Sequence, residues 1–172
     1  MSNNCVVKGT LITLENDKTN IESLKVGEKL LSYSVEGLVN TQDKRSLGKD
    51  TVNKFEGVFS YQLIKNIWKN DFEKHYMIND TLGITEDHFV MCKRKDKEEY
   101  RWLQVEDLKI GDSLFKSNGL FEKIDKLLVI NEKTTVYNIQ VNSIFAYFAS
   151  GYLIHNGSPC AATGYGCDAC GS

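Results

Sequence analysis

Proline and histidine are scarce in this sequence, and neither sign of charge dominates it. Its 172 residues include one proline, Pro159, and three histidines, His75, His88 and His155. Twenty-one Lys and Arg residues face 23 Asp and Glu residues, which gives a formal net charge of −2. Because nucleic-acid-binding proteins usually carry a strongly basic face, we expect no nucleic-acid partner. The hydrophobic content of 41% is ordinary for a folded domain, so disorder of the whole chain is excluded.

The sequence also lacks segments that would direct it into a membrane or out of the cell. Residues 134–167 contain no charged side chain, but Asn, Gln, Ser and Gly interrupt them repeatedly, so no window of about 18 apolar residues exists. The start, MSNNCVVKG, has neither the basic nor the apolar part of a signal peptide. Five cysteines, an odd number, are not typical of a disulfide-stapled secreted scaffold. We therefore expect a soluble, cytoplasmic monomer.

Short segments rich in β-branched and aromatic residues dominate the chain, and helical periodicity is hard to find. The expected strands cover residues 5–14, 29–35, 61–68, 75–80, 88–92, 126–130 and 135–141. The uncharged region after residue 134, which includes the last of these strands, is expected to form a pair of buried strands in all. The polar residues 36–56 are expected to form a hairpin loop or a mobile excursion, and the charged residues 93–101 a hairpin tip. Many short strands with close turns indicate an all-β domain.

One segment of the sequence occurs twice. Residues 21–34, IESLKVGEKLLSYS, align without gaps on residues 105–118, VEDLKIGDSLFKSN. Each copy reads as a turn or short helical turn, then a glycine, then a strand. The repeat predicts a duplicated half-domain with pseudo-two-fold symmetry.

The composition changes abruptly after Asn156. The remaining residues, GSPCAATGYGCDACGS, hold the only proline and four of the 13 glycines, so we expect a flexible tail. Cys160, Cys167 and Cys170 could form a redox pair or, with His155, a zinc site. A CxxC motif without a fourth ligand nearby is weak evidence for zinc, and we expect neither a metal nor a cofactor.

Five motifs follow one another along the chain. They are C-x-x-x-G-T-x-I at residues 5–12, the twofold L-K-x-G-[ED] turn, T-x-x-H at residues 85–88, V-Y-x-I-x-V at residues 136–141 and Y-F-A-x-G-x-L-I-H-N at residues 147–156. In this order they resemble the Hint domain, the self-processing module of inteins, bacterial intein-like domains and polymorphic toxins. The resemblance implies an all-β horseshoe fold of two pseudo-symmetric halves. It also implies a short N-terminal flank (residues 1–4), a Hint domain (residues 5–156) and a Cys-rich C-terminal flank (residues 157–172). Residues 114–124 leave no room for a homing endonuclease, so the module is minimal.

The first candidate reaction is cleavage before Cys5. A thiol beside its own preceding carbonyl can attack the Asn4–Cys5 peptide bond and convert the amide into a thioester by an N–S acyl shift. His88 is the candidate acid for the leaving amine, and Thr85 is a supporting hydroxyl or backbone contact. Cys5 alone would more often be an inert buried thiol, and His88 alone a core histidine. Their order, with His-Asn downstream, favours catalysis.

The second candidate reaction is cyclisation of Asn156. Its side-chain nitrogen attacks its own backbone carbonyl, which forms a succinimide and releases the amine of Gly157. His155 can polarise that carbonyl or protonate the leaving nitrogen, and the missing Cβ of Gly157 leaves the attack unhindered. An exposed Asn-Gly turn is the simpler interpretation of such a motif, but here the motif ends a buried hydrophobic strand.

The chain departs from the family at several positions. Asn138 stands where the family commonly has Asp, and Phe145 stands where a histidine often follows, so both are candidate modulators of Asn156 cyclisation. Splicing needs Cys, Ser or Thr directly after the asparagine. Gly157 occupies that place, whereas Ser158 and Cys160 are displaced by one and three residues. We therefore expect cleavage to outweigh ligation.

The sequence thus predicts a cis-acting, single-turnover, autoproteolytic domain whose partners are its own flanking peptides. Two alternatives stay open. One is a trans-acting cysteine protease with a Cys5–His88 dyad, and the other is a degenerate Hint scaffold without activity. His75 and Cys92 are expected to be structural.

Overall fold

The computed structural model describes residues 4–156, and nearly all of its regular structure is β. The strands are β1 (Val6–Val7), β2 (Leu11–Thr13), β3 (Lys18–Asn20), β4 (Lys29–Val35), β5 (Gly57–Phe72), β6 (His75–Ile78), β7 (Leu82–Ile84), β8 (Phe89–Lys93), β9 (Tyr100–Gln104), β10 (Ser113–Phe115), β11 (Phe121–Lys123), β12 (Leu127–Ile130), β13 (Thr134–Val141), β14 (Ala146–Ala149) and β15 (Tyr152–His155). The helical turns are η1 (Ile21–Ser23), α1 (Lys44–Leu47) and η2 (Val105–Asp107). The predicted all-β class is confirmed. No helix among these residues has the length and apolarity needed to cross a membrane.

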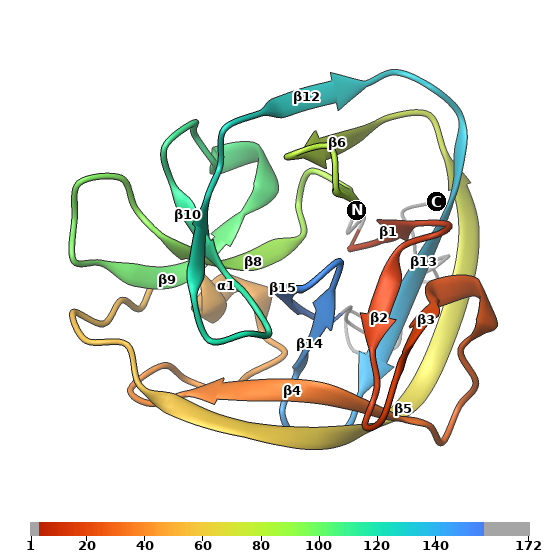
Figure 1. Ribbon diagram of the computed structural model, residues 1–172, viewed down its shortest axis with the longest axis horizontal. Helices are drawn as coiled ribbons and strands as arrows, with labels where there is room; N and C mark the ends of the chain where they lie inside the picture. The colour runs from red at the N-terminus through yellow and green to blue at the C-terminus, as the bar shows by residue number, and fades with distance from the viewer. Residues whose placement is uncertain (1–3, 157–172) are drawn as a thin grey trace.

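The strands form two antiparallel sheets. The first has the order β12-β6-β7-β1-β13-β5-β4, and the second has the order β11-β10-β8-β15-β14-β2-β3, with β9 paired to β8. In Figure 1 the long strands β4 and β5 curve around the lower and right-hand side, β12 closes the top, and β14 and β15 lie inside this open ring. The horseshoe arrangement therefore encloses the strand that ends at His155.

The two copies of the sequence repeat fold alike. Each begins with a 3-10 turn, η1 or η2, and leads into a strand, β4 or β10. Gly27 has φ +95° and Gly111 has φ +97°, a left-handed conformation that glycine adopts without steric cost. The acidic residue that follows closes each turn: Glu28 accepts a hydrogen bond from the Lys25 amide at 2.7 Å, and Asp112 does the same for Lys109 at 2.9 Å.

The symmetry extends to the residues before each copy. The amide of Ile21 donates to the carbonyl of Thr10 at 2.8 Å, and the amide of Val105 donates to the carbonyl of His88 at 3.0 Å. Thr10 and His88 therefore occupy equivalent places in the two halves. The prediction of a duplicated half-domain agrees with these matching hydrogen bonds.

The polar residues 36–56 are the loop of the β4–β5 hairpin, in which Val35 pairs with Gly57. This loop is held against the body of the protein and is not a detached excursion. Leu47 of α1 is buried, Arg101 of β9 donates to the Gly48 carbonyl at 2.5 Å, and Val52 forms a β-bridge with Tyr100. The polar residues 36–56 thus pack beside the interior.

The uncharged region after residue 134 differs from the prediction. It contains three buried strands within the described residues, where the sequence predicted a pair. Ser150 (φ 50°) and Gly151 (φ 84°) make the tight turn between β14 and β15, and this turn was hidden inside an otherwise apolar segment. Because β13 lies in the first sheet and β14 and β15 lie in the second, the region connects the two sheets.

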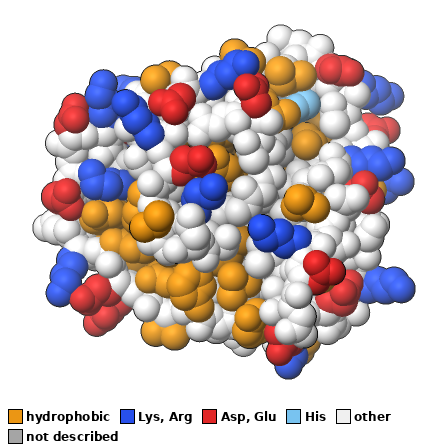
Figure 2. Space-filling model, viewed as in Figure 1, with side chains coloured by type: hydrophobic (Ala, Val, Ile, Leu, Met, Phe, Trp, Pro, Cys, Tyr) orange, Lys and Arg blue, Asp and Glu red, His pale blue; other side chains and the backbone are white. Residues whose placement is uncertain are grey.

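Positive and negative side chains alternate on the surface. Figure 2 shows them interspersed over the face drawn, with hydrophobic side chains gathered in the part where β4 and β5 run. Strand β5 exposes Val58, Phe59, Tyr61 and Leu63. The face carries no large area of one sign, in agreement with the near-zero net charge of the sequence.

The left-handed glycine of the first repeat turn provides a test of this fold. A Cβ at Gly27 would meet no atom within 4 Å, so Gly27→Ala should cost only the backbone strain, roughly 1–2 kcal/mol of unfolding free energy. Gly27→Asn should cost less, because Asn enters the left-handed region more readily. Chemical denaturation of both variants measures the difference. Equal stability of both variants and the native chain would contradict the assigned turn.

Candidate functional site

Cys5 and Thr85 lie side by side in the first sheet. Strand β1 pairs with β7 through Val6 and Ile84, so the residues flanking this pair, Cys5 and Thr85, become neighbours. The hydroxyl of Thr85 accepts a hydrogen bond from the Cys5 amide at 2.9 Å, and the amide of Thr85 donates to the Cys5 carbonyl at 3.0 Å. The Cys5 nitrogen belongs to the Asn4–Cys5 peptide bond, so Thr85 contacts the bond that the sequence predicts to be cut. Asn4 and Cys5 are both buried.

The described residues contain two cysteines, Cys5 and Cys92. The sulfur of Cys5 can act as a nucleophile only as a reduced thiol. Cys92 is a free thiol, and burial, together with the nearby Asp112 carboxylate, raises its pKa to about 12. Cys92 is therefore protonated at neutral pH and belongs to the hydrophobic core, in agreement with the structural role expected for it.

His88 connects the two ends of the domain. It immediately precedes β8 and is fully buried. Its Nε2 lies 2.5 Å from the carbonyl oxygen of His155, and because a carbonyl can only accept, Nε2 carries the proton. Burial, and secondly the charge of Lys44, lower the pKa of His88 to about 3, against the opposing backbone contacts with His155 and Cys5. His88 is therefore neutral at pH 7, and its Nε2 faces the C-terminal junction.

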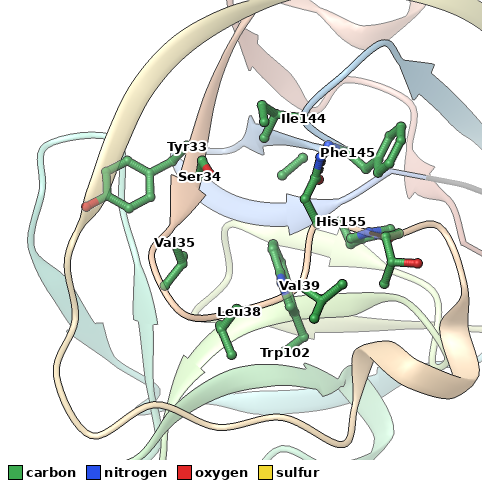
Figure 3. A pocket seen from close by; sticks show the side chains of 12 residues that line it. Tyr33, Ser34, Val35, Leu38, Val39, Trp102, Ile144, Phe145 and His155 are labelled. Carbon is green, nitrogen blue, oxygen red and sulfur yellow. Dashed lines mark hydrogen bonds between the residues drawn. The ribbon is translucent and has the colours of Figure 1, made fainter.

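His155 ends β15 in a fixed orientation. Its Nε2 donates to the Thr41 carbonyl at 2.7 Å, which leaves Nδ1 without a proton in the neutral ring. Burial, and then the charge of Lys44, hold the pKa of His155 well below its usual value, so the ring is neutral. The Trp102 ring packs edge-on against it at 5.4 Å. Figure 3 shows His155 at the wall of a small pocket, with Trp102 and Phe145 beside it.

Asn156 is completely buried, and the ends of two strands hold it in place. Its amide donates to the Phe145 carbonyl at 2.9 Å. The side chain satisfies both neighbours when Nδ2 donates to the Phe145 carbonyl at 3.1 Å and Oδ1 accepts from the Val141 amide at 3.2 Å. Because Asn156 is buried and held in this way, it does not lie in the exposed Asn-Gly turn that was the simpler interpretation of the motif.

Lys44 is the residue of this site that sequence reasoning missed. Its Nζ lies 2.8 Å from the carbonyl oxygen of Asn156 and 2.9 Å from Nδ1 of His155. The residue as a whole is partly exposed, but its ammonium group is enclosed by these partners and by the Phe89 ring at 5.8 Å. Burial lowers the pKa of Lys44 to about 7, against the opposing charge of Asp87. Lys44 belongs to no motif, and nothing in residues 36–56 indicates which carbonyl it reaches.

The two candidate modulators lie in different parts of the site. Asn138 is buried in β13 opposite Trp68, on the same face as Val136, which packs against Cys5. Phe145 lies at the other junction, where its ring centre is 6.5 Å from that of His155. Its backbone carbonyl binds Asn156, so this contact does not depend on which side chain stands at position 145.

Several predicted positions lie outside the described residues. These are Gly157, Ser158, Cys160, Cys167 and Cys170, and with them the suggested redox pair and zinc site of the tail. Within residues 4–156, no group of three or more His, Cys, Asp or Glu side chains is arranged to hold a metal ion. His75 pairs with Ile130 between β6 and β12.

Comparison with known proteins places this geometry in a family. The family model of the pretoxin HINT domain matches residues 45–158. The bacterial intein-like domain from Clostridium thermocellum is similar in structure, with a TM-score of 0.67 and 20% identity over 90% of this chain and 100% of that one. The gp41-1 intein follows with a TM-score of 0.62 and 17% identity over 90% and 100%. A DnaB intein from Synechocystis sp. PCC 6803 has a TM-score of 0.64 and 11% identity over 90% and 99%. No curated protein sequence matches the chain.

Proposed function

We propose that this chain, which belongs to the pretoxin HINT domain family, cuts the peptide bonds on either side of its own β domain. The first cut is made by Cys5 and the second by Asn156, each once per molecule. The observation that carries the proposal is that the Thr85–His88 turn reaches both junctions: the Thr85 hydroxyl binds the Cys5 amide at 2.9 Å, and Nε2 of His88 binds the His155 carbonyl at 2.5 Å. Two junctions that are about 150 residues apart in the sequence thus share one dry interior.

The first cut begins at the reduced thiol of Cys5. The sulfur attacks the carbonyl carbon of Asn4, the carbon–nitrogen bond breaks, and a thioester replaces the peptide bond. Neutral His88 can take the thiol proton and return it to the leaving Cys5 nitrogen. Thr85 holds that nitrogen through its hydroxyl at 2.9 Å. Water or an added thiol then releases the N-terminal flank.

The second cut is cyclisation of Asn156. Nδ2 attacks the backbone carbonyl carbon of the same residue, the bond to the Gly157 nitrogen breaks, and a succinimide forms. The proton lost by Nδ2 balances the proton gained by the leaving nitrogen. The hydrogen bonds of this side chain with the Phe145 carbonyl and the Val141 amide hold it at the buried end of the sheet. They reduce the conformational entropy that the attack would otherwise cost.

Cleavage is the outcome that we expect, because Gly157 has no side-chain nucleophile to receive the acyl group from the thioester. Ligation would have to pass through Ser158 or Cys160, which are displaced from the junction. The gp41-1 and DnaB proteins named above are inteins by description. At Gly157 the present chain departs from the requirement of splicing for Cys, Ser or Thr.

Burial favours cutting in cis over turnover of an added peptide. Cys5 and His88 are both 0% exposed, so a separate substrate has no path to a Cys5–His88 dyad, whereas the flanks are covalently attached to it. A degenerate scaffold would retain the same fold without either cut.

A fusion with a folded protein at each end tests the proposal. In the presence of reductant, mass spectrometry should find cuts before Cys5 and after Asn156. Cys5→Ala should abolish only the first cut, and Asn156→Ala only the second, because each removes the attacking group of one reaction. A native fusion that stays at full length would establish the degenerate scaffold, and multiple turnover of an added peptide would establish the protease.

The two cuts should differ in their need for reductant. The first cut uses the Cys5 sulfur as a reduced thiol, so it should be undetectable under oxidising conditions and appear once dithiothreitol is added. Asn156 cyclisation uses no sulfur and should proceed at the same rate in both conditions. Cys92→Ser is the control and should change neither rate. A first cut that proceeds equally under oxidising conditions would contradict the role of Cys5.

The Thr85 hydroxyl should matter only for the first cut. Thr85→Val keeps the shape but removes the acceptor for the Cys5 amide, and we expect the first cut to slow by about 10- to 100-fold, the effect of one lost hydrogen bond in the transition state. Thr85→Ser keeps a hydroxyl and should stay within a few-fold of the native rate. Equal slowing of the Asn156 cut would indicate a folding defect instead.

A further inference from the structure

We propose that Lys44 is a catalytic residue of the second cut, in which its ammonium group binds the Asn156 carbonyl oxygen and stabilises the negative charge that develops there. This inference rests on the proposed function and adds to it a residue from the β4–β5 loop, far from every family motif. The oxygen belongs to the bond that breaks, and Nζ of Lys44 is 2.8 Å from it. A cationic donor aimed at a developing oxyanion in a dry site is among the most effective catalytic groups.

His155 does not donate a hydrogen bond to the Asn156 carbonyl. Its only proton is on Nε2 and points to the Thr41 carbonyl at 2.7 Å. Its Nδ1 is a bare acceptor 2.9 Å from the Asn156 oxygen, and two acceptors cannot bind each other. Lys44 lies between them and donates to both. The His-Asn motif predicted the polarising role for its histidine. The geometry makes His155 a positioning residue and Lys44 the donor.

The loop holds Lys44 in place by several contacts. Asp43 precedes α1 and accepts hydrogen bonds from the Arg45 amide at 3.0 Å and from the Ser46 hydroxyl at 2.9 Å. Leu47 anchors the turn in the core, and the Phe89 ring faces the ammonium group. The side chain therefore stays beside the carbonyl at little cost in entropy when the reaction begins.

Proton transfer is also possible from this position. As the Asn156–Gly157 bond breaks, the leaving nitrogen of Gly157 needs a proton. This nitrogen is attached to the Asn156 carbonyl carbon, and Lys44 binds the oxygen of the same carbonyl. Lys44 can give one of its protons to that nitrogen and recover the proton that Asn156 Nδ2 releases. Both protonation states of Lys44 are accessible near neutral pH, since burial lowers its pKa to about 7.

The pH dependence follows from the groups around Lys44. Asp87, on the turn between β7 and β8, is the carboxylate that favours its charge, while burial opposes it. His88 and His155, the other titratable neighbours, have lowered pKa values and stay neutral at pH 6–8. Lys44 is charged below pH of about 7 and neutral above it, so the rate of the second cut should fall as the pH rises through 7.

The test uses the fusion protein with Cys5→Ala, in which only the second cut occurs. Lys44→Met keeps the length of the side chain without its charge and should slow this cut by about 100-fold. Lys44→Arg stays charged at all accessible pH values, so the decline of the rate above pH 7 should disappear. Arg45→Met, a change at the exposed neighbour in α1, is the matched control and should leave the rate and its pH profile unchanged.

A second measurement separates catalysis from folding. In the fusion with native Cys5, Lys44→Met should leave the reductant-dependent first cut within about twofold of the native rate, because Lys44 contacts the other junction. Native speed of the second cut in Lys44→Met, or equal loss of both cuts, would overturn the inference while leaving the proposed function in place. Absence of any cut in the native fusion would overturn both.

Discussion

The interior hydrogen bond between His88 and the carbonyl of His155 is the contact on which the site depends. It joins the residue before β8 to the last residue of β15 at 2.5 Å, in a region where neither group can reach water. A buried carbonyl or imidazole left without its partner would cost about 1–3 kcal/mol, so the bond fixes how β15 lies against β8, where only Ile154 and Val90 form a registered pair. Through that strand it also determines where Asn156 ends the sheet.

Symmetry and asymmetry combine to build this interior. The duplicated turns place Thr10 and His88 at equivalent points, each accepting from the first residue of its repeat copy. One half therefore contributes an inert threonine where the other contributes an imidazole. The β4–β5 loop breaks the symmetry further, since it brings Lys44 and the Thr41 carbonyl onto His155. A scaffold of two similar halves thus gains a single site, with the reactive groups concentrated where its two ends meet.

The environment of the site keeps its basic groups uncharged or nearly so. Burial lowers the pKa of His88, His155 and Lys44 together, and the charge of Lys44 further lowers the pKa of both histidines. Of these three groups, only Lys44 has a pKa close to neutral pH, at about 7. In a cluster of three bases that share one dry space, repulsion allows one positive charge at a time, and the group nearest the Asn156 carbonyl holds it.

The sequence alone predicted the all-β class from its short β-branched segments, the repeat from its alignment on itself, and Cys5, Thr85, His88, His155 and Asn156 as candidate site residues from the ordered motifs. Each of these depends on local spacing and residue type. The tertiary structure alone decided three things: the tautomer of His155, the third buried strand after residue 134, and the arrival of Lys44 at the Asn156 carbonyl. Each depends on a contact between segments distant in sequence, such as the 112 residues between Lys44 and Asn156. A polar loop carries no periodicity that reveals its partner, and only the packing of Leu47 and the register of β4 on β5 bring Lys44, one of the loop's three lysines, inside.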